Sequence, residues 1–316
     1  MCKRKLPILV LLLMLCVGVN LAQTTSGSIT GTVVDPQGAS VANAAIKVTE
    51  EGKNYTLTAT TDSEGRFVFA IVQPGIYTIT IEANGFKKQE RKGVTLVSND
   101  KLSLGNLSLE VGAPTETVEI QSEATLIQAD SGERSFGIQG EQIRNLGVKT
   151  RSYINLATLA PGVVANGAGD GNSSDSNGIS VNGVRTNSNN VQIDGITSVD
   201  TGNNAQLSRI PLDSVGEFKL VTSSSQAEYG RSSGAQIIAV TRSGSQDFHG
   251  SFYYYRRHTG LNANTFENNR STSATPPARP ISDQEDIGYT IGGPIYIPRV
   301  LENKKKLYFF VNQEWT

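Results

Sequence analysis

The first third of the chain alternates hydrophobic and polar residues in short runs that turn residues separate. Runs of this kind cover residues 29–34, 45–48, 66–69 and 77–81. Between them lie Asp-Pro-Gln-Gly, Asp-Ser-Glu-Gly and Pro-Gly, in which Pro or Asp opens a turn and Gly takes the positive φ. Short strands at this spacing, without a helical period, predict a small β-sandwich over residues 27–110.

Residues 121–245 mix two periods. Apolar residues recur at helical spacing in 140–146 and 152–159, and a Pro-Gly pair ends the second run. Strands are expected at 179–185 and 191–196, closed by Asn-Gly and Asp-Gly turns, and again at 217–221 and 237–241. A helical turn with an early proline is expected at 211–215, and 165–177 is a polar loop. The segment therefore predicts an α+β domain.

Residues 246–316 form a third kind of pattern, in which aromatic strands alternate with polar connections. Strands are expected at 248–256, 289–297 and 306–311, with a long polar loop at 259–286 and a shorter basic turn at 298–305. This order is typical of the start of an antiparallel transmembrane β-barrel. Because three strands cannot close a barrel, we expect the chain to be a truncated product or a fragment of a longer reading frame. The alternative is a soluble protein whose last strands complete a small domain of their own.

The N-terminus has the layout of a secretory signal peptide over residues 1–22. Three basic residues precede an apolar run over residues 6–19, which is shorter than the roughly 20 residues of a spanning helix, and the small residue Ala22 follows it. An uncleaved anchor is the alternative. Both cysteines, Cys2 and Cys16, lie in this segment, so cleavage leaves no thiol for disulfides, zinc or nucleophilic catalysis. Cleavage also takes the formal net charge from -1 to -4, which gives no support for nucleic-acid binding.

The sequence offers weak candidates for catalysis or metal binding. Residues 230–234 match G-x-S-x-G, but the flanking pattern lacks the strand and helix of a nucleophile elbow. The only histidines, His249 and His258, fit no metal-ligand spacing. Asp170, Asp175 and Asp200 lie among Asn and Gly without the order of a calcium loop. We therefore expect no enzyme, no catalytic residue, no metal and no cofactor.

Two segments resemble known domains. G-x-V-x-D-x-x-G, T-D-x-E-G-x-F-x-F and P-G-x-Y-x-I resemble the carboxypeptidase regulatory-like domain, a transthyretin-like β-sandwich. Its aromatic residues Phe67, Phe69 and Tyr77 are expected in the core of a rigid spacer, with carbohydrate contact as the alternative. V-N-G, I-D-G-I, I-x-L-D-S-V-G-E-F-K-L-V, A-E-Y-G-R-S-S-G and V-T-R-S-G-S resemble the plug of a TonB-dependent outer-membrane receptor. The fullest likeness is to Oar-like receptors, which carry the same sandwich in front.

The resemblance implies a multidomain fold and a set of site residues. The expected order is signal peptide (1–22), sandwich (27–110), linker with a TonB box (111–120), α+β plug (121–245) and incomplete β-barrel (246–316). The TonB box would comprise Glu116, Thr117, Val118, Glu119 and Ile120, although the same alternation suits an ordinary first strand of the next domain. Structural or gating roles in the plug would fall to Asn182, Gly183, Asp194, Gly195, Glu228, Tyr229, Gly230, Arg231 and Gly234.

The function that this resemblance implies is import across the outer membrane. The plug would block the barrel, an extracellular ligand would bind from outside, and a TonB-type inner-membrane protein would pull on the TonB box. The barrel would contact outer-membrane lipid, and the sandwich would lie in the periplasm. The alternative is a secreted or periplasmic module that binds glycan or protein without transport. The two differ in whether the aromatic strands face lipid.

Overall fold

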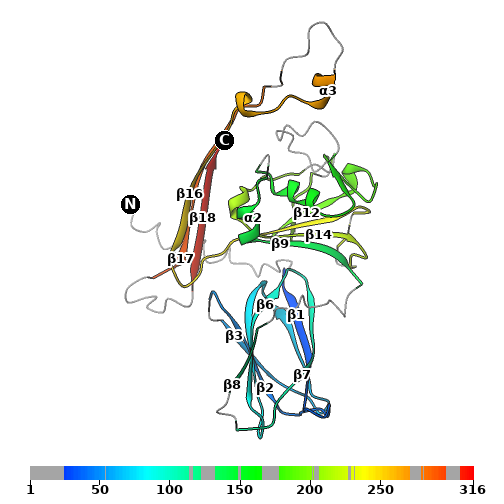
Figure 1. Ribbon diagram of the computed structural model, residues 1–316, viewed down its shortest axis with the longest axis vertical. Helices are drawn as coiled ribbons and strands as arrows, with labels where there is room; N and C mark the ends of the chain where they lie inside the picture. The colour runs from blue at the N-terminus through cyan, green and yellow to red at the C-terminus, as the bar shows by residue number, and fades with distance from the viewer. Residues whose placement is uncertain are drawn as a thin grey trace, which may run out of the picture.

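The computed structural model describes most of the chain in three parts, a sandwich, a plug above it and a group of long strands beside the plug (Figure 1). The described residues are 25–53, 55–113, 117–121, 132–148, 151–165, 178–200, 202, 206–226, 229–230, 232–270, 279, 281–296 and 307–316. Expectations for the signal peptide and for the polar loop at 166–177 fall outside them. The multidomain fold class predicted from the sequence is confirmed.

The sandwich consists of a three-stranded and a five-stranded sheet. The first has the order β4 (Arg66–Val72), β1 (Gly27–Val34), β7 (Lys101–Ser108), and β1 runs parallel to β7. The second has the order β3 (Thr56–Thr60), β2 (Ala45–Glu50), β5 (Gly75–Glu82), β6 (Lys88–Leu96), β8 (Thr117–Gln121). Alternate residues of both sheets point inward, and Phe67, Phe69 and Tyr77 lie buried among them. Hydrophobic burial between the sheets therefore holds the domain together.

Strand β8 extends the sandwich beyond the region assigned to it from the sequence. It contains four of the five residues expected to form the TonB box, and it pairs in parallel with β6. Alternation predicted an extended strand here. It could not predict which sheet the strand would join, because pairing partners lie far apart in the sequence.

The plug is built on a five-stranded sheet with two different faces. Its order is β13 (Ile196–Thr197), β12 (Asn190–Ile193), β15 (Gln236–Thr241), β14 (Val215–Ser223), β9 (Arg134–Gln139). One face packs against α2 (Gly140–Asn145), the 3-10 helices η1 (Tyr153–Leu159) and η4 (Leu212–Ser214), and the pair β10 (Val163–Ala165) and β11 (Ile179–Val181). Phe218 and Leu220 point into this core, whereas the alternate residues of β14 point toward the sandwich. The run at 152–159 is therefore helical as expected, but it is 3-10 and not α.

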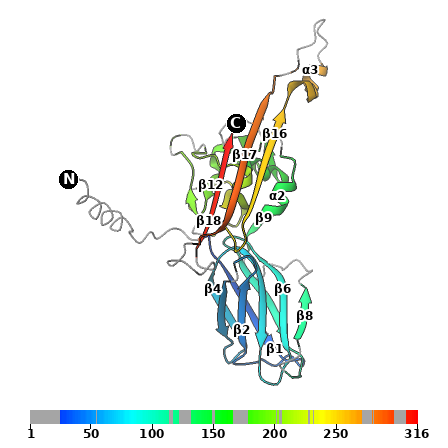
Figure 2. The same cartoon turned by 90° about the vertical axis from the view of Figure 1, so that its left-hand side faces the viewer.

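Three long antiparallel strands follow the plug. β16 (His249–Arg257), β17 (Gln284–Pro294) and β18 (Tyr308–Trp315) form one sheet with β17 in the middle, and the strands rise beside the plug (Figures 1 and 2). The connection between β16 and β17 contains η5 (Thr259–Leu261) and α3 (Phe266–Arg270). β17 begins at Gln284, so the loop is shorter than the segment 259–286 that the sequence pattern predicted. The pattern missed the start of this strand because its first inward positions are polar and therefore resemble a loop.

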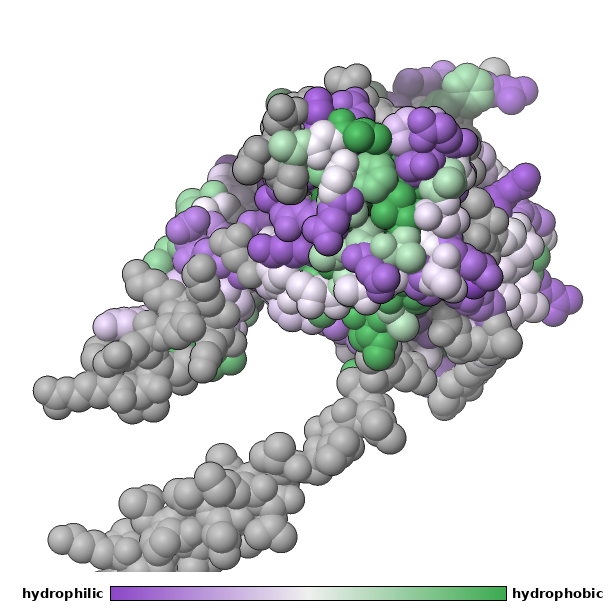
Figure 3. All heavy atoms as spheres, turned by 90° about the horizontal axis from the view of Figure 1, so that it is seen from below, coloured by the Kyte–Doolittle hydropathy of each residue, from purple (hydrophilic) through white to green (hydrophobic). Residues whose placement is uncertain are grey.

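Two further observations concern the lower surface of the molecule and its helices. Seen from below, hydrophobic residues form a band across a mostly hydrophilic lower end (Figure 3). Within the described part of the chain, no helix has the length and hydrophobicity that crossing a membrane requires.

Candidate functional site

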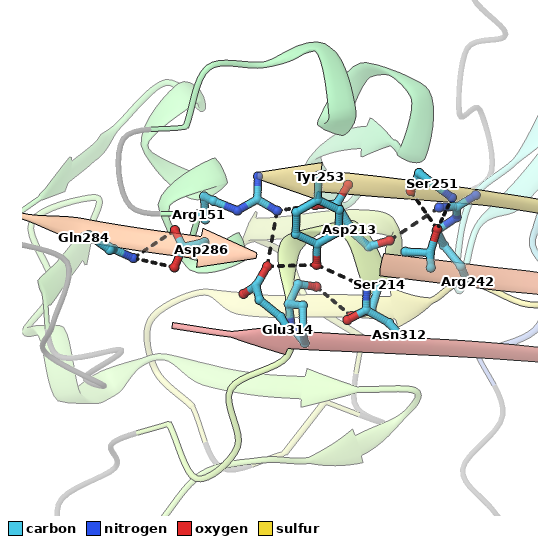
Figure 4. Close-up of polar contacts among 12 residues, drawn as sticks. Arg151, Asp213, Ser214, Arg242, Ser251, Tyr253, Gln284, Asp286, Asn312 and Glu314 are labelled. Atoms are coloured by element: carbon cyan, nitrogen blue, oxygen red, sulfur yellow. Dashed lines mark hydrogen bonds and ion pairs between the residues drawn. The ribbon is translucent and has the colours of Figure 1, made fainter. Parts of the chain in front are cut away.

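The junction between the plug and the long strands is centred on Arg151. The Nη2 atom of Arg151 contacts the Asp213 carboxylate and lies 3.4 Å from Glu314 Oε2 (Figure 4). Its guanidinium carbon lies 3.9 Å from the ring centre of Tyr255 and 4.8 Å from that of Tyr253. One cation from the plug therefore joins a plug carboxylate, a carboxylate of β18 and two aromatic rings of β16.

Local structure places each of these groups. Arg151 has a φ of 51°, a left-handed backbone conformation that few residues other than glycine adopt. It lies two residues before the start of η1. Asp213 lies in η4, which Pro211 precedes. Tyr253 and Glu314 occupy inward positions of β16 and β18, and the Tyr253 hydroxyl donates to Glu314 Oε2 at 2.9 Å. The strands thus present polar side chains to the plug.

The charge of Arg151 is stabilised despite its burial. Only 11% of its side chain is exposed. Burial alone would lower the pKa of Arg151, but the hydrogen bond that Arg151 donates to Asp213 and the negative charges of Asp213 and Glu314 outweigh it and hold the pKa above its ordinary value. Because breaking a buried ion pair leaves a charge uncompensated, the junction resists separation.

A second cation, Arg242, and a glycine, Gly244, also contact β18 from the end of the plug. The Arg242 guanidinium lies 5.1 Å from the ring centre of Phe310 on β18. Where the chain leaves the plug, a Cβ at Gly244 would lie 2.3 Å from the Phe309 carbonyl oxygen. Only glycine allows this approach of plug and strand backbones.

Inward and outward residues of the three strands differ in chemistry. Inward positions other than Phe310 carry polar or small residues, among them Ser251 and Thr290, whose hydroxyls lie 2.7 Å apart, and Asp286, which accepts from Gln284 (Figure 4). Exposed outward positions carry mostly large apolar residues. These are Phe252, Tyr254, Ile287, Tyr289, Ile291, Val311 and Trp315. Apolar outside and polar inside is the pattern of a transmembrane β-barrel wall.

A cavity of about 790 Å³ opens beside the Arg151 cluster. It lies between the plug and the upper part of β17, and its lining includes Tyr153, Gln206, Arg209, Asp283 and Glu285. Gln206 Nε2 donates to the Tyr153 hydroxyl at 2.6 Å, which fixes one wall. The lining therefore mixes polar and apolar groups and carries both signs of charge.

The sandwich meets the plug through a polar turn, residues 97–100. The Ser98 amide donates to Glu217 Oε1 at 2.7 Å, and Asn99 Nδ2 donates to the Tyr229 hydroxyl at 2.6 Å. Lys219 Nζ lies 2.8 Å from Asp100 Oδ1 and donates to the Ser98 carbonyl at 3.1 Å. The turn is thus attached to the sandwich-facing side of β14.

Lys219 is the centre of a buried ion cluster at this second junction. Its side chain is 2% exposed and bridges Asp100 of the sandwich to Glu133 of the plug, whose Oε1 lies 2.9 Å from Nζ. Burial opposes the charge, but the two carboxylates outweigh it, so the pKa of Lys219 lies above its ordinary value. For Glu217, burial raises the pKa to about 7, because the Ser98 amide and Lys219 compensate only in part. The junction therefore contains a carboxyl group that titrates near neutrality.

The structure places the predicted plug residues in turns and contacts and not in one cluster. Asn182 and Gly183, and likewise Asp194 and Gly195, have positive φ and close the two expected turns. The Asp194 carboxylate accepts from the amide of Thr241 at 2.7 Å and from its hydroxyl at 2.8 Å, which ties a turn to the end of β15.

The other predicted residues divide into described and undescribed ones. Tyr229 contacts the sandwich turn, and Gly234 donates its amide to the Ser188 carbonyl at 3.0 Å. A Cβ added at Gly230 would meet none of the described atoms within 4 Å. Glu116, Glu228 and Arg231 lie outside the described residues, and of the TonB box only the backbone of 117–120 and the half-buried Val118 are described.

Sequence reasoning missed the residues that join the three parts. Arg151, Asp213 and Glu314 show no motif spacing, and Lys219, Asp100 and Glu133 lie in three separate segments. One signal was available, because Glu217 and Lys219 place charges at alternate positions of an otherwise apolar strand. Charges in that position require partners from another element.

The serine and the two histidines considered above for catalysis or metal binding make hydrogen bonds to nearby residues. The Ser232 hydroxyl donates to the Ser188 carbonyl at 2.6 Å, and strand β15, not a helix, follows it. His249 contacts Ser245 and Asp247, and His258 accepts from the Gly260 amide. Among the described residues, no group of three or more His, Cys, Asp or Glu is placed to hold a metal ion.

Three segments of the chain match known domain families. Residues 28–110 match the carboxypeptidase regulatory-like domain, residues 129–235 the TonB-dependent receptor plug domain, and residues 240–316 an outer membrane beta barrel domain. The TonB-dependent transporter Oar of Myxococcus xanthus is 29% identical over 294 residues, which make up 90% of this chain and 26% of Oar. The chain thus spans about a quarter of the length of that relative.

Two solved structures are also similar to the chain. The siderophore receptor PirA from Acinetobacter baumannii has 15% identity and a TM-score of 0.37 over 56% of this chain and 24% of PirA. The outer membrane transporter YddB from Escherichia coli has 19% identity and a TM-score of 0.37 over 50% of this chain and 24% of YddB.

The chain is a homologue of TonB-dependent transporters, with a plug domain and an outer-membrane barrel domain behind a regulatory-like sandwich. These domains locate it to the outer membrane. The related protein is a transporter, so the prediction that the chain is not an enzyme is confirmed.

Proposed function

We propose that the full-length protein imports an extracellular ligand through an outer-membrane barrel that the plug keeps closed. An energised periplasmic partner of the TonB type opens the path by pulling on residues 116–120. The sandwich lies in the periplasm, and the outward apolar side chains of β16, β17 and β18 face lipid. The described residues do not favour one class of ligand.

The observation that carries this proposal is the Arg151 junction. It joins plug to strand through charge-assisted contacts of the single nitrogen Nη2 with two carboxylates and through stacking of the guanidinium on Tyr255, and these contacts are not covalent. Contacts of this kind hold two bodies together at rest and re-form after they are separated. A plug that seals a lumen and moves under load requires both properties. The side chains at this site therefore have mechanical and not acid-base roles.

The TonB box assignment is tested by partner binding to the full-length receptor. Deleting residues 116–120, or replacing Val118 with Pro, removes a strand or one of its backbone N–H groups. We expect either change to abolish binding of the purified periplasmic domain of the cell's own TonB-type protein, measured by calorimetry. Val118→Ile is the matched control, since it keeps a β-branched residue with its N–H. Unchanged binding by the deletion variant at normal outer-membrane levels would remove the assigned role.

A further inference from the structure

Strand β8 is ordered before any partner arrives. Its pairing with β6 runs over five residues, from Lys88 opposite Thr117 to Lys92 opposite Gln121. β8 is the last strand of its sheet in the part of the chain that the structure describes, and it lies at the outer margin of the sandwich (Figure 2). One edge of β8 is thus used by β6, and the other edge has no strand partner among the described residues.

Such an edge is a template for another strand. Its backbone N–H and C=O groups are already aligned for pairing, and native proteins usually protect edges of this kind. Fixing the backbone of a residue costs conformational entropy, and pairing with β6 has already met this cost for the five residues of β8. A partner strand that adds to this edge therefore orders only itself. A partner that first strips β8 from β6 gains no such advantage.

The position of β8 is also fixed relative to the plug. The turn 97–100, which follows β6 directly, holds β14 through the Asp100–Lys219 ion pair and the Ser98–Glu217 hydrogen bond. A second contact joins the sandwich to the start of the long strands, where Gln246 Nε2 donates to the Lys53 carbonyl at 2.7 Å. A mechanical force applied to β6 can therefore pass to the plug sheet through these contacts, without passing through the linker at 111–120.

We propose that the partner adds a strand to the free edge of β8 while β8 remains paired with β6. The docking surface is then an extension of the sandwich sheet, and the sandwich is the part of the protein that the partner grips. This inference rests on the proposed role of residues 116–120 as the partner-binding segment. It differs from the simpler scheme in which that segment leaves as a free strand.

The test is a covalent lock between β8 and β6 in the full-length receptor. Gln89 and Val118 are directly paired, and neighbouring strands bring Cα atoms within the distance that a disulfide spans. Residues 17–316 contain no cysteine, so Gln89→Cys with Val118→Cys introduces the only thiols of this segment there. The probe is the purified periplasmic domain of the cell's TonB-type protein, and its Kd is measured with the receptor oxidised and reduced.

The oxidised receptor should bind this probe with a Kd within fivefold of the reduced receptor. A lock placed elsewhere in the same sheet, Lys47→Cys with Thr80→Cys on the paired strands β2 and β5, controls for oxidation itself. A second lock, Lys88→Cys with Thr117→Cys, repeats the test should the first pair fail to oxidise.

The possible failures are distinct. Binding by the reduced but not by the oxidised receptor would overturn the inference and leave the proposed function standing, because β8 would then have to leave β6. Absence of binding by the wild-type receptor, with its β8 intact, would defeat the proposed partner role and the inference together.

Discussion

Replacing Glu217 with Gln should abolish a pH dependence of the contact between sandwich and plug. Glu217 is buried, its Oε1 accepts from the Ser98 amide, and its pKa is raised from 4.5 to about 7, chiefly by burial. A carboxyl group with a raised pKa stabilises the closed junction while it is protonated. This stabilisation is complete below pH 4.5 and is lost as the pH rises through about 7.

The two pKa values set the size of the effect. One pKa unit corresponds to about 1.4 kcal/mol, so titration of Glu217 should weaken the junction by about 2.5 kcal/mol between pH 5 and pH 8. This equals a roughly seventyfold rise in the open population. In the Gln variant the amide oxygen still accepts from Ser98, but nothing titrates. Its junction should therefore be nearly independent of pH and stronger than that of the wild type at pH 8.

Hydrogen exchange of the full-length receptor measures this directly. The peptide that contains Ser98 is followed between pH 5 and pH 8, with correction for the intrinsic pH dependence of exchange, and a peptide from the β5 core of the sandwich is the reference. We expect protection at Ser98 to fall with pH in the wild type and to stay level in Glu217→Gln. Equal slopes in both proteins, or greater wild-type protection at pH 8, would show that Glu217 is ionised in the closed junction and refute the reasoning.

Two further substitutions test the ion clusters. Arg151→Lys keeps the charge but loses the planar guanidinium and its stacking on Tyr255, so the plug–strand contact should weaken by about 2 kcal/mol. Hydrogen exchange in β18 and η4 should accelerate, and unchanged exchange would contradict the assigned contact. Lys219→Met leaves Asp100 and Glu133 buried without their cation and should cost about 3–5 kcal/mol at the sandwich–plug junction. Adding Asp100→Asn and Glu133→Gln should restore most of that loss, as judged by protection of residues 97–100, and no recovery would show that Lys219 acts through packing alone.

The sequence predicted the parts of the fold that local chemistry decides. Asn182 with Gly183 and Asp194 with Gly195 occur where the chain needs consecutive positive φ values, and both turns form there. The sandwich core follows from simple alternation around Phe67 and Tyr77. Each of these signals lies within a few neighbouring residues, so one sequence is enough to recognise it.

The contacts between domains could not be predicted in the same way. Arg151 meets Glu314 from 163 positions away, and Lys219 meets Asp100 from 119. A charge in an apolar strand, such as Lys219, indicates that a partner is needed, but no local pattern identifies that partner, and Arg151 and Glu314 by themselves suit a solvated surface. The sequence pattern missed the start of β17 for a related reason. Gln284 and Asp286 face inward toward the plug, and a strand with a polar inner face resembles a loop when the strand it pairs with is unknown.

The two ion clusters divide the plug between two neighbours. Arg151 and Asp213 bind the long strands, whereas Glu217 and Lys219 on β14 bind the sandwich. The raised pKa of Glu217 makes the sandwich contact the one that responds to pH near neutrality, while Arg151 keeps its charge throughout that range. Under the proposed function, a pull that enters through the sandwich reaches β14 first and meets the Arg151 contacts only after crossing the plug sheet. Because the two junctions use separate ion clusters, substitutions at Lys219 and at Arg151 should change the strength of each junction separately.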